Sequence, residues 1–207
     1  IHHLISDAWT LAFICNEIIK TYSALKQNKE IETKAIYSYI DYIKSEKQYQ
    51  ESEKYQKDKK YWKEQFSTIP EVATIYGSKG NIDDTNPEGE RKQFSLDIAD
   101  VEEIKEYCKI NKISLYNFFM AVYSIYIGEI SNLDDFVIGT PILNRTNFKE
   151  KNAAGMFINT APFRINVKED IEFKEFIKNI AINSLNMLKH QKYSYQCLLE
   201  DLREKDK

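Results

Sequence analysis

The C-terminal half of the chain alternates between segments with the spacing of helices and segments with the spacing of strands. A short unbroken apolar run at Phe136–Ile138, followed by Gly139-Thr140-Pro141, is typical of a buried strand. In chain order, the expected elements are a strand over residues 91–96, helices over 97–109 and 115–130, strands over 136–138 and 157–167, and helices over 172–189 and 195–204. Strands that alternate with helices in this way predict an α/β (α+β) fold, in which helices flank a mixed sheet.

The N-terminal third is predicted to be helical. Ser6 or Asp7 can cap a helix that runs to about Leu25. The apolar residues of this helix share one face and predict a buried stripe of Trp9, Phe13, Ile14, Ile18, Tyr22 and Leu25. Between residues 35 and 66, Tyr and Ile residues recur among charges, which indicates one or two surface helices. Residues 69–89 hold three of the six glycines and two of the four prolines, so they predict a loop and a lobe boundary.

The composition is that of an ordinary globular protein, 43% hydrophobic and 29% charged, with a net charge of −3. It offers no basic surface field for nucleic acid, which we therefore do not expect as a partner. Cys15, Cys108 and Cys197 are odd in number and widely spaced, so reduced thiols in a cytoplasmic protein are expected. No apolar stretch approaches the roughly 18 residues of a membrane span, so we expect no membrane partner.

The opening segment, residues 2–9 with the sequence HHLISDAW, carries the strongest chemical signal. Histidine moves protons at neutral pH, so His3 is a candidate to accept a proton from an attacking amine or hydroxyl. Adjacent residues of an extended segment face opposite sides, so His2 and His3 cannot both address one site, which disfavours a metal centre. Asp7 is expected either to orient the histidine or to pair with a buried arginine. The alternative is a helix-capping loop with ordinary histidines.

Motifs along the whole chain resemble those of nonribosomal peptide synthetase condensation domains. HHLISDAW is similar to the HHxxxDG signature of that family. Further segments resemble later motifs of the family, in the same order: Tyr39-Ile40-Asp41-Tyr42-Ile43 with Tyr61-Trp62, then Phe136-Val137-Ile138-Gly139-Thr140-Pro141 with Asn144-Arg145, then Gly155-Met156-Phe157-Ile158-Asn159-Thr160 with Arg164, and His190-Gln191-Lys192-Tyr193-Ser194-Tyr195-Gln196. Each match is weak alone, and their joint order is specific.

The resemblance implies a chloramphenicol acetyltransferase-like fold, with two lobes around a tunnel. It implies an acyltransferase of secondary metabolite biosynthesis. An acceptor amine on a downstream peptidyl carrier protein attacks a donor acyl or peptidyl thioester on an upstream carrier, and an amide bond forms. Phosphopantetheine arms of the carriers hold both substrates, so no directly bound cofactor is expected. An adjacent adenylation domain is a further expected partner.

The resemblance also assigns roles to individual residues. His3 matches the catalytic histidine of the family. Asp7 matches an aspartate that pairs with an arginine and holds the active-site loop. Arg145 is the first candidate for that arginine by its place in the motif, and Arg164 is the second.

Other residues match positions along the substrate tunnel. Asn159 matches an asparagine of the family that lies near the tunnel, and its alternative role is to satisfy backbone groups at a strand end. His2, Ala8 and Trp9 are likewise expected beside the tunnel. No metal ligands are expected.

The sequence departs from the family pattern at several motif positions. Ala8 replaces a glycine, and its methyl group disfavours a positive φ. Asn144 replaces another glycine, although asparagine tolerates left-handed backbone. Ser194 and Gln196 replace proline and glutamate. These changes permit a slow enzyme or a degenerate, non-catalytic domain that docks carriers or a partner enzyme. An epimerization domain is disfavoured because its E-G-H-G-R-E motif is not found.

Family motifs expected before His2 and after residue 207 are absent, which predicts an incomplete two-lobed domain. By the family layout, residues 1–70 end the N-lobe, 71–90 form a linker and 91–207 form a truncated C-lobe. The chain alone is therefore expected to be inactive in condensation. Exposed apolar surface would make a dimer of the fragment plausible.

Overall fold

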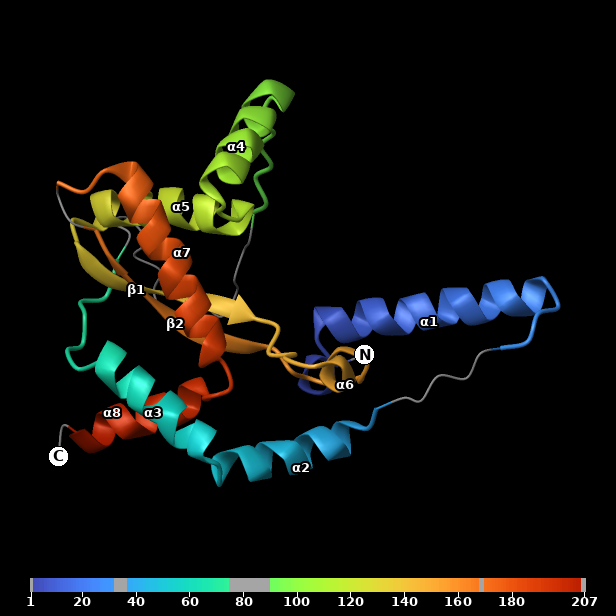
Figure 1. The fold of residues 1–207 in the computed structure, drawn as a ribbon. Coiled ribbons are helices and arrows are strands. Elements are labelled where there is room, and N and C mark those ends of the chain that lie inside the picture. Colours follow the sequence, from blue (N-terminus) through green and yellow to red (C-terminus); the bar gives the residue numbers. More distant parts are fainter. Residues whose placement is uncertain (1, 32–36, 75–89, 168–169, 206–207) are drawn as a thin grey trace. The chain divides into compact units, whose positions relative to one another are not determined.

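The computed structural model describes residues 2–31, 37–74, 90–167 and 170–205 (Figure 1). The described elements, in order, are the single-turn helix His3–Ile5, α1 (Ala8–Lys26), α2 (Tyr39–Gln50), α3 (Glu53–Gln65), α4 (Ile98–Asn111), α5 (Leu115–Ser131), β1 (Asp135–Ile142), α6 (Phe148–Lys151), β2 (Asn159–Asn166), α7 (Phe173–Lys189) and α8 (Tyr195–Lys205). Among these residues, β1 and β2 pair in a two-stranded sheet. The expected α/β class is therefore confirmed, with a sheet of two strands among the described residues.

The chain divides into two compact units, which are described separately below. Unit 1 comprises residues 1–67, 139–162 and 190–207, and unit 2 comprises residues 68–138 and 163–189. The lobe boundaries expected at residues 70 and 90 remain a prediction. Residues 75–89 of the expected linker lie outside the described residues.

Unit 2 is built on helices α5 and α7, which pack against each other (Figure 1). The buried residues of α7 lie one, three or four positions apart and form one mostly apolar face: Phe176, Ile177, Ile180, Ser184 and Met187. At Gly128 of α5 an added Cβ would lie 3.1 Å from the Leu133 carbonyl oxygen, which is tight, and 3.5 Å from the Phe136 ring, which is an ordinary contact. The Phe136 ring is fully buried.

Unit 1 joins α3 to the segment that leads into α8. The ring of His190 stacks on Tyr61 with centroids 4.0 Å apart, and its Nδ1 lies 2.5 Å from Oδ1 of the fully buried Asp58. The indole of Trp62 donates to the carbonyl oxygen of His190 at 3.0 Å. His190, the first residue of the last family-like segment, therefore contributes a packing contact between two parts of this unit.

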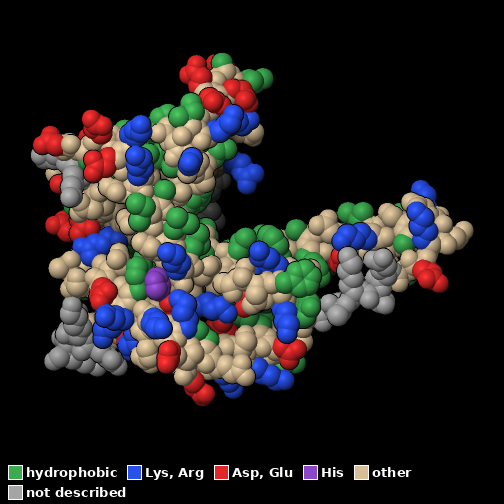
Figure 2. All heavy atoms as spheres, viewed as in Figure 1, with side chains coloured by type: hydrophobic (Ala, Val, Ile, Leu, Met, Phe, Trp, Pro, Cys, Tyr) green, Lys and Arg blue, Asp and Glu red, His purple; other side chains and the backbone are tan. Residues whose placement is uncertain are grey.

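The apolar stripe of α1 was expected to be core, and this prediction is wrong. Within α1 only Thr10 is buried, whereas Tyr22 is 65% exposed and Ile18 and Leu25 are similarly exposed. Figure 2 shows hydrophobic side chains at the surface along this helix. Phe13 and Ile14 are half-buried, so the exposure is greatest toward the C-terminal end of the helix.

The strand expected over residues 91–96 is also wrong. These residues have no regular structure, and both Phe94 and Leu96 are exposed. Alternation predicts a strand only where a neighbouring strand and a core receive its two faces, and the described residues supply neither here. The other expected helices and strands are confirmed, with boundaries shifted by a few residues.

Among the described residues, no single helix combines the length and apolar character needed to cross a bilayer. The bent pair of α4 and α5, at 105°, passes that test by length and composition alone.

Removal of the Phe136 ring should destabilise unit 2. Phe136→Ala leaves a cavity in a site with no solvent access, so we expect the free energy of unfolding to fall by about 3–5 kcal/mol. Phe94→Ala is the matched control, because this side chain is 88% exposed, and it should change that free energy by less than about 0.5 kcal/mol. Urea unfolding followed by circular dichroism measures both, and equal losses would contradict the described core.

Candidate active site

His3 lies on a single helical turn at the start of unit 1. His2 caps this turn, since its Nδ1 accepts the backbone N–H of Leu4 at 3.1 Å. Ser6 closes it by donating its hydroxyl to the His2 carbonyl oxygen at 3.1 Å. Both imidazoles are exposed. The turn therefore presents His3 at the surface of the unit, while His2 also has a local structural contact.

Asp7, directly after this turn, is buried and fully engaged. It caps α1 by accepting the backbone N–H of Thr10 on Oδ1 at 2.8 Å. Its Oδ2 accepts the backbone N–H of Phe157 at 3.0 Å. Nη2 of Arg145 donates to both carboxylate oxygens, at 3.1 and 3.2 Å, and each side chain is only 1% exposed. The pairing of Asp7 with Arg145 that the sequence predicted is present.

Arg145 connects this carboxylate to several other groups. Its Nη1 donates to the carbonyl oxygens of Glu150 and Ala153, the latter at 2.7 Å. Its guanidinium carbon lies 3.8 Å from the centre of the Phe157 ring, which is the geometry of a cation–π contact. Asn144, just before it, has a φ of 51°, so asparagine holds the left-handed backbone where the family has glycine.

Arg164, the second candidate, has a different partner. It donates to the Asp135 carboxylate, at 2.8 Å from Nε, and to the carbonyl and hydroxyl oxygens of Thr68. This ion pair belongs to unit 2. Arg164 therefore does not serve as the partner of Asp7.

Burial alone would raise the pKa of Asp7, because a buried carboxylate loses its hydration. The backbone amides of Thr10 and Phe157, the Thr10 side chain and the charge of Arg145 oppose it and hold the pKa of Asp7 below its ordinary value. Burial lowers the pKa of Arg145, and the charge of Asp7 opposes that change. A guanidinium stays protonated at neutral pH, so both partners are charged.

Ala8 and Trp9 lie at the start of α1. Ala8 is its first residue, exposed and with helical backbone geometry. The expectation that its methyl group would disfavour the required backbone is therefore wrong, because no positive φ is needed there. Trp9 is 38% exposed, and its indole donates to the Lys151 carbonyl oxygen at 3.0 Å.

Asn159 is the first residue of β2 and is half-buried. Its Oδ1 accepts the backbone N–H of Thr160 at 2.9 Å. This contact is the strand-end role considered as an alternative. Its expected place beside a tunnel stays a prediction.

Sequence reasoning missed three residues around the Asp7–Arg145 pair. The hydroxyl of Thr10 bonds to both backbone groups of Gly155, and the ring of Tyr39 covers the same glycine. Tyr39 and Gly155 lie in motifs already singled out, and Thr10 directly follows the HHLISDAW segment. Their contacts join residues more than 100 positions apart, so no local pattern could reveal them.

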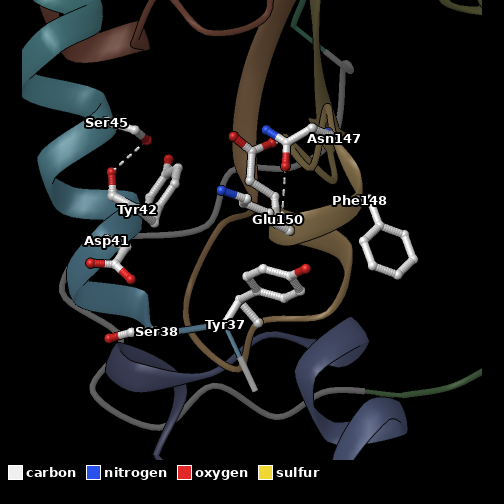
Figure 3. A pocket seen from close by; sticks show the side chains of 10 residues that line it. Tyr37, Ser38, Asp41, Tyr42, Ser45, Asn147, Phe148 and Glu150 are labelled. Atoms are coloured by element: carbon white, nitrogen blue, oxygen red, sulfur yellow. Dashed lines mark hydrogen bonds between the residues drawn. The ribbon is translucent and has the colours of Figure 1, made fainter. Parts of the chain in front are cut away.

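A cavity of about 450 Å³ lies between α2 and α6 in unit 1 (Figure 3). Its walls are the aromatic rings of Tyr37, Tyr42 and Phe148, with Asp41 and Glu150 among the polar groups. Glu150 is already held by the backbone N–H of Thr146 and by Lys192. None of the residues expected in the active site lines this cavity. Across the described ranges, no cluster of three or more His, Cys, Asp or Glu side chains could hold a metal ion.

Asp7→Asn should destabilise the chain at neutral pH. The substitution keeps the side-chain size but leaves the buried Arg145 charge without its partner, which costs about 3–5 kcal/mol of unfolding free energy. Asp41→Asn is the matched control, since that carboxylate is 72% exposed and should contribute less than about 1 kcal/mol. Chemical unfolding of both variants tests this. A similar loss of unfolding free energy in each would show that the Asp7–Arg145 pair stabilises the fold no more than an exposed carboxylate does.

The contribution of Asp7 should also depend on pH in a defined direction. Its pKa is lowered by folding, so ionisation stabilises the fold above the unfolded value of about 4, and the effect is lost as pH falls through the lower folded value. The difference in unfolding free energy between wild type and Asp7→Asn should be constant from about pH 5 to 7 and should shrink below about pH 4. A difference that grows on acidification would contradict the pairing.

Known proteins match this chain over almost its whole length. A family model for the condensation domain matches residues 1–207. Surfactin synthase subunit 1 of Bacillus subtilis (strain 168) is 34% identical over 209 residues, which cover 99% of this chain and 6% of that protein. One plipastatin synthase subunit of the same organism is 30% identical over 206 residues, covering 100% of this chain and 8% of that protein.

Solved structures show the same fold. The first condensation domain of the calcium-dependent antibiotic synthetase, in complex with a substrate analogue, superposes with a TM-score of 0.83 and 19% identity, over 98% of this chain and 44% of that one. The condensation domain of Monacolin K polyketide synthase superposes with a TM-score of 0.76 and 22% identity, over 97% of this chain and 46% of that one. The chain thus spans under half of these structures and a small part of the synthetases. It belongs to the condensation domain family of nonribosomal peptide synthetases, with their chloramphenicol acetyltransferase-like fold.

Proposed function

We propose that this chain supplies the histidine-bearing part of a condensation domain that joins two carrier-bound substrates through an amide bond. The donor is an acyl or peptidyl thioester, and the acceptor is an aminoacyl thioester. The acceptor amine attacks the donor carbonyl carbon, a carbon–nitrogen bond forms and the carbon–sulfur bond breaks. The amine loses a proton, and the donor phosphopantetheine leaves as a thiol.

The observation that supports this role is the buried pair of Asp7 and Arg145. Both oxygens of Asp7 are occupied by Arg145 and by two backbone amides. Asp7 is therefore a fixed structural charge rather than a proton carrier. It anchors the end of the turn that bears His3, which leaves the exposed imidazole of His3 to take the amine proton or to hold the amine in place.

The substrates and partners follow from the same proposal. Carrier proteins on both sides deliver the two thioesters on phosphopantetheine arms, so the chain itself needs no bound cofactor. An adenylation domain loads the acceptor carrier. The 207-residue chain spans 44% of the first condensation domain with which it superposes. We propose that this chain alone does not form amide bonds.

A non-catalytic docking domain is the alternative. Ala8 is one of the departures in its favour, and the backbone at Ala8 is an ordinary helix start. Ser194 and Gln196, near the start of α8, remain as departures from the family motif. Retention of His3 with an intact Asp7–Arg145 pair favours the enzyme.

The decisive test is a product assay on the complete condensation domain that contains this chain, with loaded donor and acceptor carriers. His3→Ala should lower the rate of amide formation by about 10²–10⁴-fold, the usual contribution of a positioned proton-transfer group. Leu4→Ala removes the neighbouring exposed side chain of the same turn and should leave the rate near that of wild type.

Three results would contradict parts of this proposal. Equal rates of product formation by wild type and His3→Ala would show that His3 takes no part in the reaction. Carrier binding without product in the wild type would favour the docking domain. Amide formed by the 207-residue chain alone would disprove its inactivity.

A further inference from the structure

We propose that Thr10 and Tyr39 are positioning residues for condensation, because together they clamp Gly155 and so hold the entry to β2 against the loop that bears His3. The inference rests on the proposed function. It concerns two side chains that neither carry charge nor belong to the expected set of site residues. Thr10 comes from the start of α1, and Tyr39 is the first residue of α2.

Thr10 is 1% exposed, and its hydroxyl is saturated with hydrogen bonds. It donates to the carbonyl oxygen of Gly155 at 2.6 Å. It accepts the backbone N–H of Gly155 at 3.0 Å and Nη2 of Arg145 at 2.8 Å. A hydroxyl has one donor and two acceptor lone pairs, so this geometry uses its full capacity. Both backbone groups of one glycine are thus bound to one side chain of the His3 loop.

Tyr39 holds the same glycine from a different helix. Its hydroxyl donates to the Met156 carbonyl oxygen at 2.6 Å. Its ring lies so close over Gly155 that an added Cβ would be 2.1 Å from Cδ2 of the ring. The ring also meets Phe157 edge-on, with centroids 5.3 Å apart. Only glycine leaves room for this ring.

Three consecutive residues are therefore fixed before the strand begins. Gly155 is bound by Thr10, Met156 by Tyr39, and Phe157 by the carboxylate of Asp7. β2 starts two residues later, at Asn159. A shift of residues 155–157 would move the strand entry relative to Asp7, the anchor of the His3 turn.

The hydrogen bonds of the buried Thr10 hydroxyl go to Gly155 and Arg145 of the same chain. Its contribution is therefore geometric. Small misplacement of reacting groups lowers the rate of a bound complex much more than it weakens binding, and a displacement of about 1 Å costs on the order of 10²-fold. Loss of either hydroxyl should consequently reduce kcat and leave KM for the carriers unchanged.

The test uses the complete condensation domain with loaded carriers. Thr10→Val and Tyr39→Phe each remove one hydroxyl and retain the side-chain volume, and we expect kcat to fall by about 10- to 100-fold. Thr10→Ser restores the hydroxyl and should recover most of kcat. The pH profile of kcat should keep its shape in all three variants, because His3 is unchanged.

Tyr49→Phe is the matched control. The Tyr49 hydroxyl donates to Oδ2 of the buried Asp58 at 2.8 Å, in the same unit but outside the site. This variant should lose stability comparable to that lost by Tyr39→Phe and keep the kcat of the wild type. Hydrogen exchange of the backbone amides of residues 155–157 should be faster than in the wild type in Thr10→Val and Tyr39→Phe, and unchanged in Tyr49→Phe.

Each outcome decides between the possibilities. If product depends on His3, but Thr10→Val and Tyr39→Phe keep the kcat of Tyr49→Phe, the positioning role is overturned and the proposed function stands. If the wild type forms no amide, both the positioning role and the proposed function are overturned. If Thr10→Val does not fold, Tyr39→Phe, which loses a single hydrogen bond, decides alone.

Discussion

The buried ion pair of Asp7 and Arg145 is the interaction on which the rest of unit 1 depends. Each charge removed from water is expensive, and the pair is stable only because nearly every remaining hydrogen-bonding position is filled. Those positions are filled by the start of α1, the segment before β2 and the backbone after Arg145. One ion pair thereby joins parts of the chain that lie almost 140 residues apart in sequence.

This arrangement separates the two buried charges from the imidazole that we propose to react. Asp7 and Arg145 neutralise each other inside the unit, where neither can exchange protons with a substrate. His3, four residues before Asp7, stays exposed on a short capped turn. A rigid buried charge next to a free imidazole lets the loop hold one geometry while the ring remains available. The structural role of Asp7 and the catalytic role proposed for His3 thus fall on a buried and an exposed residue of the same motif.

Local features of the fold were predictable, and long-range features were predictable only through motif resemblance. Asp7 caps α1 as expected, and Ser114 caps α5 in the same way, because capping depends on residues three positions away. The Asp7–Arg145 pair followed from the family motifs and not from periodicity. The exposed stripe of α1 and the irregular residues 91–96 were mispredicted because apolar spacing reports what a segment can bury, not whether a partner covers it. The Thr10 and Tyr39 contacts needed three-dimensional structure.

Because the Tyr39 ring lies directly against Gly155, the sizes of the side chains at these two positions depend on each other. A larger residue at position 155 has no space unless the ring at position 39 shrinks, and a smaller residue at position 39 leaves a void beside the glycine. The two motifs that contain them should therefore vary together during evolution, with substitutions tolerated as pairs and rejected singly. A domain assembled by recombination between α2 and β2 would bring together two halves that had adapted separately to this contact.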